Sequence, residues 1–494
     1  MFDWLFGRAG RKAPAPLSVG VRRVSARYDA AASGDENRRH WANADALSPA
    51  SANTLAVRKV LRERSRYEIA NNSYAKGIVL TLANDCIGTG PRLQMLTDDA
   101  EANKAIESAF ESWTASIFLA EKLRTVRMSK AQDGESFGIL TTNPILPTPV
   151  KLDLCLVECD QVTDPTNTKG ADGIVFDAYG NPDTYTVRRE HPGTSGASMD
   201  ADKIPAASVL HYFRADRPGQ ARGIPEITAA LGLFAQLRRY TLAVIGAAEV
   251  AADMAMVIQS DASAETGADE VEALSTIDLE KRMATVLPEG WKLNQTKAEQ
   301  PTTGHDEFVK GKLNEVARCL NVPFNVAYGN SSGYNYASGR LDHQVYFKSI
   351  RVEQSVIEGV ILDRLFAAWL AEAILVPNLI PDSMKAEGVV AVHQWFWDGN
   401  EHVDPSKEAD AQGTRLGNNT TNLAIEFAKV GRDWEAEIRQ RAKELALCNE
   451  LGVPTSTAPL GGESEPEEEE NSDEEENKTA KGIARVRVPV NGRA

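Results

Sequence analysis

Residues 225–258 constrain the fold of this chain more than any other segment. They are mostly Ala, Leu, Ile and Val, and Pro225 suits the first turn of a helix. The pattern predicts one helix of roughly 45–50 Å at 1.5 Å per residue. A helix that is apolar nearly all round needs cover on most sides. Because Glu249 and Asp253 interrupt the apolar run, we expect neighbouring subunits to supply that cover, and no membrane span.

Charge is distributed unevenly along the 494 residues. The formal net charge is −16, ten acidic and no basic residues lie between Glu463 and Glu476, and the first forty residues lean basic. We expect a flexible basic arm over 1–52 and a disordered acidic tail over 453–494. The net charge argues against tight general binding to nucleic acid. Five scattered cysteines and no secretory pattern indicate a soluble product of a reducing compartment.

Between these tails the sequence predicts a mainly helical α+β fold. Short strands separated by Pro, Gly, Asn and Asp turns are expected at 137–140, 152–157, 173–176 and 183–187. Apolar residues at helical spacing predict helices at about 55–66, 74–87, 101–113, 225–258, 305–320 and 338–375.

Capping residues divide the segment 404–450 into three short helices. Asp404 is expected to cap the first, Thr420 or Thr421 the second, and Asp433 the third. Glycines 417, 431 and 452 follow the three helices and are expected to end them.

One short motif suggests a hydrolase. Residues 329–333, Gly-Asn-Ser-Ser-Gly, match the G-x-S-x-G nucleophile elbow, in which Ser331 would attack and His343, His393 or His402 would act as the base. The elbow needs a buried strand before it, and Pro-Phe-Asn at 323–325 is a poor one. A surface loop is therefore the preferred interpretation, and the hydrolase is the alternative.

The other candidate motifs also favour structural interpretations. Cys155 and Cys159 have no second Cys or His pair, which favours small buried residues over a zinc site. The acids of Asp133-Gly134-Glu135 are interpreted as solvated turn residues rather than a metal nuclease site. The basic residues of 55–66 are interpreted as a solvated helix face rather than a phosphate site. No P-loop motif occurs. The sequence thus predicts no catalytic, cofactor-binding or metal residue, and no enzyme.

The order of several short motifs resembles one family. Each motif is weak alone, but together they resemble the lambda-type portal proteins of tailed bacteriophages over residues 53–452. That family often has Tyr-Ser-Ser where this chain has Tyr-Ala-Ser at 336–338, and Pro in place of Cys159. The motifs are NNSYAKG (71–77), NDCIGTG (84–90), DGESF (133–137), ECDQ (158–161), GIVFD (173–177), GNP (180–182), HYF (211–213), RPGQARGIP (217–225), VP (322–323), NYASGR (335–340) and DPSKE (404–408).

The resemblance implies a ring of twelve subunits around a central channel, with wing, stem, clip and crown regions in each subunit. Mapped onto this chain, the wing covers 53–223 and 323–403, and its long helix 338–375 lies near the tunnel. The stem covers 224–322 and contains the clip at about 259–304. The crown covers 404–452.

The resemblance also implies the function and the partners. Double-stranded DNA would enter and leave the capsid through the ring, which would dock the terminase large subunit and later the head–tail connector proteins. The capsid and scaffold proteins would be further partners. The protein would be in the virion, after assembly in the host cytoplasm. Arg340, Lys348 and Arg351 are the candidates for DNA contacts in the tunnel. A head–tail adaptor that never encloses DNA is a further alternative.

Overall fold

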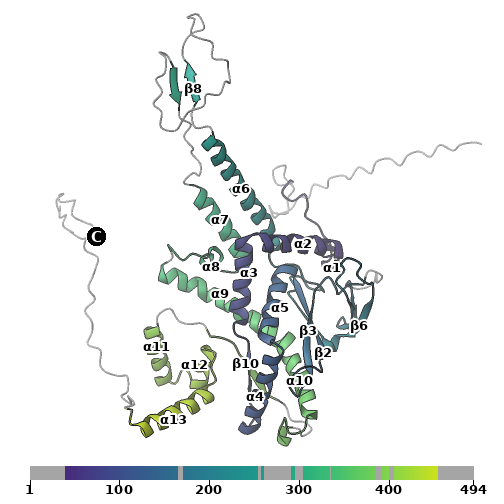
Figure 1. Cartoon of the computed structure of the whole chain (residues 1–494), viewed down its shortest axis with the longest axis vertical. Coiled ribbons are helices and arrows are strands. Elements are labelled where there is room, and N and C mark those ends of the chain that lie inside the picture. The colour runs from purple at the N-terminus through teal and green to yellow at the C-terminus, as the bar shows by residue number, and fades with distance from the viewer. Residues whose placement is uncertain are drawn as a thin grey trace, which may run out of the picture.

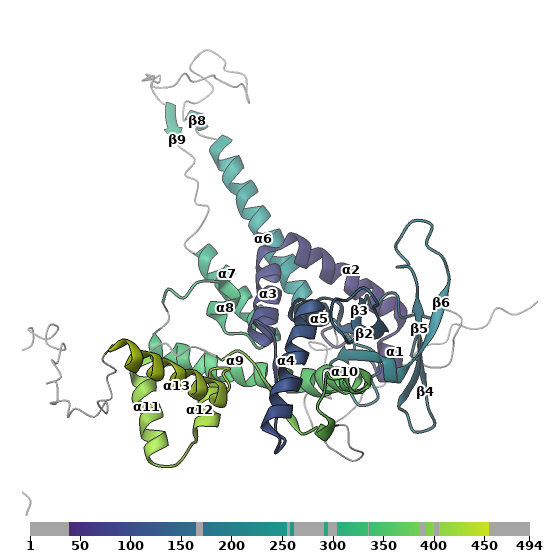
Figure 2. The same ribbon diagram turned by 60° about the horizontal axis from the view of Figure 1, so that its bottom comes forward.

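The computed structural model shows a mainly helical α+β subunit (Figure 1). A body of helices and small sheets carries a projecting pair of helices at one end and a separate three-helix unit at another (Figures 1 and 2). Most of the expected basic arm, the acidic tail beyond Val453 and most of the expected clip lie outside the described residues, whereas residues 39–52 of the arm are described and include a short helix. The structure describes residues 39–164, 171–253, 257–260, 291–294, 304–333, 335–384, 391–399 and 405–453.

The first half of the body is a group of helices. After a short turn, α1 (Pro49–Ala52), come α2 (Leu55–Asn71), α3 (Ser73–Ile87), α4 (Ala100–Ser116) and α5 (Leu119–Asp133). The side chains of Thr54, Asn72 and Asp99 accept backbone N–H bonds at the starts of α2, α3 and α4. The sequence reasoning missed α5, although Leu119, Leu123 and Val126 recur at helical spacing and are buried.

Two three-stranded antiparallel sheets follow the helices. One has the order β3-β2-β7, from β2 (Glu135–Thr142), β3 (Leu152–Val157) and β7 (Val209–Phe213). The other has the order β4-β5-β6, from β4 (Ile174–Phe176), β5 (Pro182–Arg188) and β6 (Ala201–Pro205). The four expected strands are confirmed. The strands β6 and β7 and the pair of β1 (Arg92–Met95) with β10 (His393–Phe396) were not predicted.

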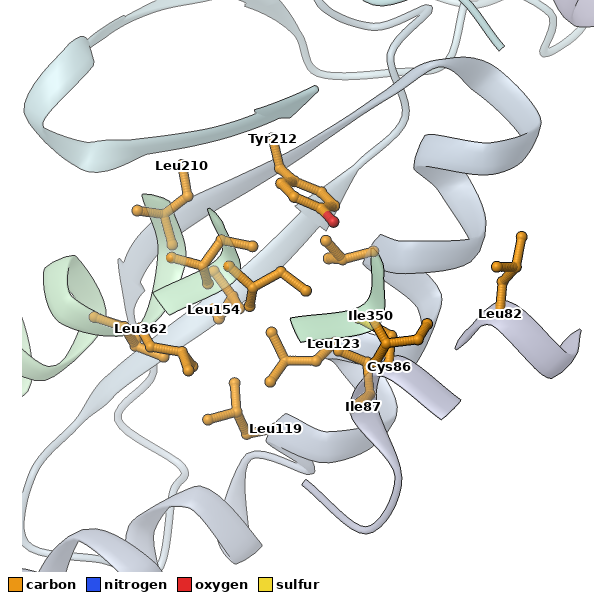
Figure 3. Packing of buried hydrophobic residues seen from close by; sticks show 14 of the residues in the cluster. Leu82, Cys86, Ile87, Leu119, Leu123, Leu154, Leu210, Tyr212, Ile350 and Leu362 are labelled. Atoms are coloured by element: carbon orange, nitrogen blue, oxygen red, sulfur yellow. The ribbon is translucent and has the colours of Figure 1, made fainter. Parts of the chain in front are cut away.

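The main core lies where α3, α5, β3, β7 and the second half of the chain meet. Figure 3 shows Leu119 and Leu123 of α5 beside Cys86 and Ile87 of α3, with Leu154 and Leu362 closing the cluster. An aromatic group surrounds Phe110, whose ring centroid lies 5.1 Å from that of Trp369 and 5.3 Å from that of Trp113. A smaller core under the second sheet includes Phe137 and Tyr185.

The long apolar segment forms α6 (Thr228–Asp253), which is shorter than predicted. It pairs with α7 (Gly304–Cys319), and the two project from the body in Figure 1. The predicted helix end was wrong: Val257–Ser260 forms β8, which pairs with β9 (Trp291–Asn294). The branched residues Val257 and Ile258 suit a strand once a partner strand is available. None of the helices in the described ranges is long and apolar enough to cross a bilayer.

A short helix, α8 (Phe324–Tyr328), leads to the predicted long helix, which consists of three pieces. These are α9 (Tyr336–Ile357), a π-helical turn at Glu358–Leu362, and α10 (Asp363–Leu375). A π turn accommodates one extra residue in a helix. It lets the buried positions before it, such as Ile350 and Ile357, and those after it, such as Trp369, face the same core.

The C-terminal helical unit comprises α11 (Pro405–Gly417), α12 (Leu423–Lys429) and α13 (Trp434–Leu451). Asp433 caps α13 as expected. The expected cap of α12 was wrong, because Asn422 and not Thr420 or Thr421 accepts the Ile425 N–H. The expected cap Asp404 and the candidate base His402 lie outside the described residues.

Candidate functional site

Helix α9 has two exposed faces with different chemistry. One face is an apolar stripe of Leu341, Val345, Val352 and Val356, with exposed fractions of 65%, 63%, 60% and 37%. By their spacing in the sequence, these residues fall in one apolar pattern with Trp369 along the predicted helix 338–375. Tertiary packing instead buries Tyr346, Ile350 and Ile357 on the opposite side and leaves the stripe free.

Beside the stripe lie the three predicted tunnel cations. Arg340, Lys348 and Arg351 are all exposed on α9, and the helical repeat places them along one flank of it. Within the part of the chain that the structure describes, none of the three forms an ion pair or hydrogen bond. Their charged groups are therefore free to contact a phosphate backbone, which Arg binds as a planar fork and Lys as a point charge.

The α6–α7 hairpin is a second exposed apolar element. Near the outer end of the hairpin, the ring of Tyr240 packs on His305 and Phe308, with centroid distances of 5.5 and 4.3 Å. Leu242 and Ile245 of α6 are nevertheless 63% and 48% exposed. Among the described residues of a single copy, apolar side chains of both α6 and α9 therefore remain exposed.

A buried charge cluster holds the body together below these helices. Its centre is Glu135 of β2, which is almost fully buried. Arg222 donates to its carboxylate from Nε and Nη2 at 2.7 to 3.0 Å, and Arg62 Nη2 donates at 2.5 Å. His211 Nε2 lies 3.1 Å from Oε2, and the Gly223 N–H donates to the same oxygen at 3.0 Å. The cluster therefore joins α2, β2, β7 and the segment before α6.

Electrostatics in the cluster follow from burial and pairing. Burial acts to raise the pKa of Glu135, but Arg222, the His211 hydrogen bond and Arg62 hold that pKa well below its usual value. Burial lowers the pKa of His211, against the opposing effect of Glu135. Burial, and then Arg222, lower the pKa of Arg58 to about 10. The carboxylate at the centre stays ionised, as a buried group between two guanidiniums must.

Two predictions are corrected by this cluster. Asp133 and Glu135 are not solvated: Asp133 is 5% and Glu135 1% exposed, and Asp133 pairs with Arg66 at 2.6 Å. The expected solvated basic face of helix 55–66 is only partly present: Arg58 and Arg62 are buried among carboxylates, whereas Lys59 and Arg64 are exposed. Gly134 does form the expected turn, at φ +91°. The spacing of four between the arginines was a usable signal, since it places them on one face.

One group of possible metal ligands does not have the geometry of a metal site. Ligand atoms of Glu158, Asp160 and His191 lie within 4.8 Å of one another. Arg66 already occupies both carboxylates, at 3.5 Å from Glu158 and 2.7 Å from Asp160. The Gly193 N–H donates to His191 Nδ1 at 3.0 Å, so the neutral ring carries its proton on Nε2, the atom that faces the carboxylates. A protonated nitrogen offers no lone pair to a metal.

The hydrolase and zinc candidates do not converge either. Ser331 is exposed on a loop after α8 rather than at a strand end. Nε2 of His343 lies 3.2 Å from Asn325 Nδ2, and His393 lies near Ala391 O and Asp363. Neither imidazole is bonded to Ser331 in the described ranges. Cys155 is exposed on β3, while Cys159 is buried in the turn after that strand, so only Cys159 fits the expected buried residue.

Comparison with known proteins gives the class of the molecule. The family model for phage portal proteins of the lambda family matches residues 36–354. A probable portal protein of Halomonas phage phiHAP-1 is 23% identical over 457 residues, covering 85% of this chain and 87% of that protein. Two similar solved chains come from the neck of an empty GTA particle and the virion of a native gene transfer agent particle. They are each 14% identical, with TM-scores of 0.46 and 0.47, and cover 74% of this chain and 92% and 91% of theirs.

The molecule is thus a portal-type structural subunit. Because the family model matches well over half of its length, the chain belongs to the lambda family of phage portal proteins. This family is structural and not enzymatic, so membership in it agrees with the prediction that the chain is no enzyme. The motifs 133–137, 158–161, 211–213 and 217–225 each contribute a residue to the buried charge cluster. In this chain these residues support the fold of the body rather than form a catalytic site.

Proposed function

We propose that this chain forms the portal ring at one capsid vertex, through which double-stranded DNA is packaged and ejected. The observation that carries the proposal is the pair of uncovered apolar faces on α6 and α9 in a member of a portal family. Identical neighbours in a closed ring would cover them. Family membership and the exposed apolar faces support a closed ring around a channel, and we propose that it has twelve subunits.

The regions map onto the structure as follows. The stem is α6 and α7, and the clip is the segment between them that contains β8 and β9. The wing is α2 to β7 together with α8 to β10. The crown is the C-terminal helical unit. The clip would dock the terminase large subunit and then head–tail connector proteins, and the wing would meet capsid and scaffold proteins.

The charge of the chain suits a channel in which DNA slides. Each copy carries −16, so a ring repels the DNA backbone overall and does not hold it tightly. Arg340, Lys348 and Arg351 are exposed cations on the helix assigned to the tunnel side. Brief contacts with passing phosphates would steady DNA without stopping it.

Electron microscopy of the purified full-length protein tests the ring. Class averages should show closed rings of about twelve subunits, with a hole of roughly 20 Å or more for duplex DNA. Assemblies without a hole would contradict the proposal and favour the adaptor that never encloses DNA.

Charge reversal tests the tunnel assignment. The triple variant R340E/K348E/R351E should form normal rings but reduce the amount of DNA packaged or retained in particles. The control reverses three exposed lysines on other helices, Lys59, Lys76 and Lys104. Equal DNA content in the two sets of particles would refute the role of the α9 cations.

A further inference from the structure

The C-terminal helical unit has no apolar core of its own. Between Ser406 and Val453 the fully buried residues are Glu426 and Gly431. Glu426 is held by Arg415, at 2.9 Å from Nη2, and by Lys429, at 2.7 Å from Nζ. The centre of the unit is therefore an ion-pair network, and such a network does not replace apolar burial as a source of stability.

Most large apolar side chains of the unit are exposed, and Leu416, Phe427 and Trp434 are only half-buried. Seven large ones are between 40% and 67% exposed, and Leu447 and Leu451 form an i, i+4 pair on α13 at 54% and 67%. Helices of this length are marginal in water without packing. A unit this small that buries so little cannot be stable alone. The seven residues are Leu423, Ile425, Val430, Ile438, Leu447, Leu451 and Val453.

The body of the subunit supports the unit at one place. Arg92 Nη1 donates to Gly431 O at 3.1 Å, and Gln94 Nε2 donates to Asp433 Oδ1 at 2.9 Å. Gly399 meets the same turn so closely that a Cβ there would lie 2.3 Å from Lys429 O. These contacts fix the α12–α13 turn to the strand pair β1–β10. They leave the Leu447–Leu451 end of α13 without cover from the body.

The near-zero net charge of the unit favours cover by an identical unit over cover by DNA or by the acidic tail. Residues 406–453 contain seven basic and eight acidic side chains, a net charge of −1. Such a surface has no cationic excess to attract DNA or the acidic block at 463–476. Two identical near-neutral surfaces, by contrast, meet without repulsion. Symmetry also brings the same unit of the next subunit alongside in a ring.

We infer that the C-terminal helical unit is stabilised by the same unit of the adjacent copy, through the exposed side chains of α12 and α13. The inference rests on the proposed ring and specifies one of its interfaces. The unit orders only on assembly, whereas the body, with its own core, is folded in the single copy.

Hydrogen exchange of the full-length protein tests this. Amides of α13 should exchange at least roughly tenfold more slowly in rings than in unassembled protein at high dilution, while β2 amides stay protected in both. The variant L447D/L451D should lose the α13 protection, or fail to form rings, with β2 exchange unchanged. The control I145D places one aspartate at a residue that is 89% exposed on a body loop, and should behave as wild type.

The outcomes separate the inference from the proposed function. Rings in which α13 exchanges as fast as in unassembled protein overturn the inference and leave the portal proposal standing. Equal α13 protection in L447D/L451D and I145D rings also overturns it. Slow α13 exchange in unassembled protein that is lost on truncation after Val453 would assign the cover to the tail instead. A protein that forms no rings at any concentration overturns both.

Discussion

Replacing Glu135 with glutamine removes the charge that two buried guanidiniums share. The substitution keeps the size of the side chain, so it leaves no cavity. It leaves Arg62 and Arg222 at 1% and 2% side-chain exposure without the carboxylate between them. It also replaces one carboxylate oxygen with an NH2 group, so the side chain has one acceptor oxygen fewer for the two arginines, His211 and the Gly223 N–H.

The expected cost is large because one side of a buried pair is removed. Such a change typically costs about 3–5 kcal/mol, since the remaining charge is uncompensated. Arg62 keeps a second partner, Asp160 at 2.9 Å, which places the expectation near the lower limit, about 3 kcal/mol. That is a sizeable fraction of the 5–15 kcal/mol, roughly, by which folded domains are stable.

Urea unfolding of the full-length protein, monitored by tryptophan fluorescence, measures the effect. With a slope of about 1–3 kcal/mol per molar urea, the E135Q midpoint should fall by about 1 M or more. The control is D202N, because Asp202 also accepts two bonds from one guanidinium, that of Arg189, but in an exposed pair. D202N should leave the midpoint unchanged.

The pH dependence of E135Q gives a second readout. The depressed pKa of Glu135 means that its contribution is complete above its ordinary value of 4.5 and is lost as pH falls through the lower, folded value. The difference in urea midpoint between wild type and E135Q should therefore become smaller in strong acid. A midpoint for E135Q equal to that of D202N at neutral pH would refute the assignment of the cluster as the main polar support of the body.

Three further predictions concern other residues. Burial lowers the pKa of His211, so the contribution of its neutral ring to stability should be fully present above pH 6.5 and be lost as pH falls through the pKa of the folded state. In melting curves at pH 7.5 and 5.5, H211Q should remove this pH dependence. W397F removes the 2.6 Å hydrogen bond from Nε1 to Glu358 at the π turn, which should lower the free energy of unfolding by about 1–2 kcal/mol and speed amide hydrogen exchange at 358–362. Unchanged amide exchange there would show that this bond does not stabilise the turn. Wild type and S331A should be equally inactive on a chromogenic ester; activity lost in S331A would restore the hydrolase alternative.

Local features were predictable from the sequence. Periodicity located most helices, and Asn72, Asp433 and the glycines at 88 and 452 have the capping or turn roles that their chemistry favours. The four strands of the β-rich region were also found. These signals are short-range: a cap, a turn or an alternation depends on residues only a few positions apart.

Non-local features were not predictable in the same way. Leu341, Val345 and Trp369 have the spacing of a single apolar helix face. Only the packing shows that Leu341 and Val345 are exposed while Trp369 is buried. Burial of Glu135 required Arg222, which is 87 positions away. The pairing of Arg92 with Phe396 joins strands about three hundred residues apart.

The sequence by itself therefore determined most of the helices, four of the strands and, through the order of its motifs, the family. The tertiary structure decided which faces of those elements are covered. The physical reason is that helix periodicity and capping depend on neighbours in the chain, whereas burial and ion pairing depend on neighbours in space. The exposed apolar faces of α9, α6 and α13 belong to the second kind, and they are the faces on which the proposed assembly depends.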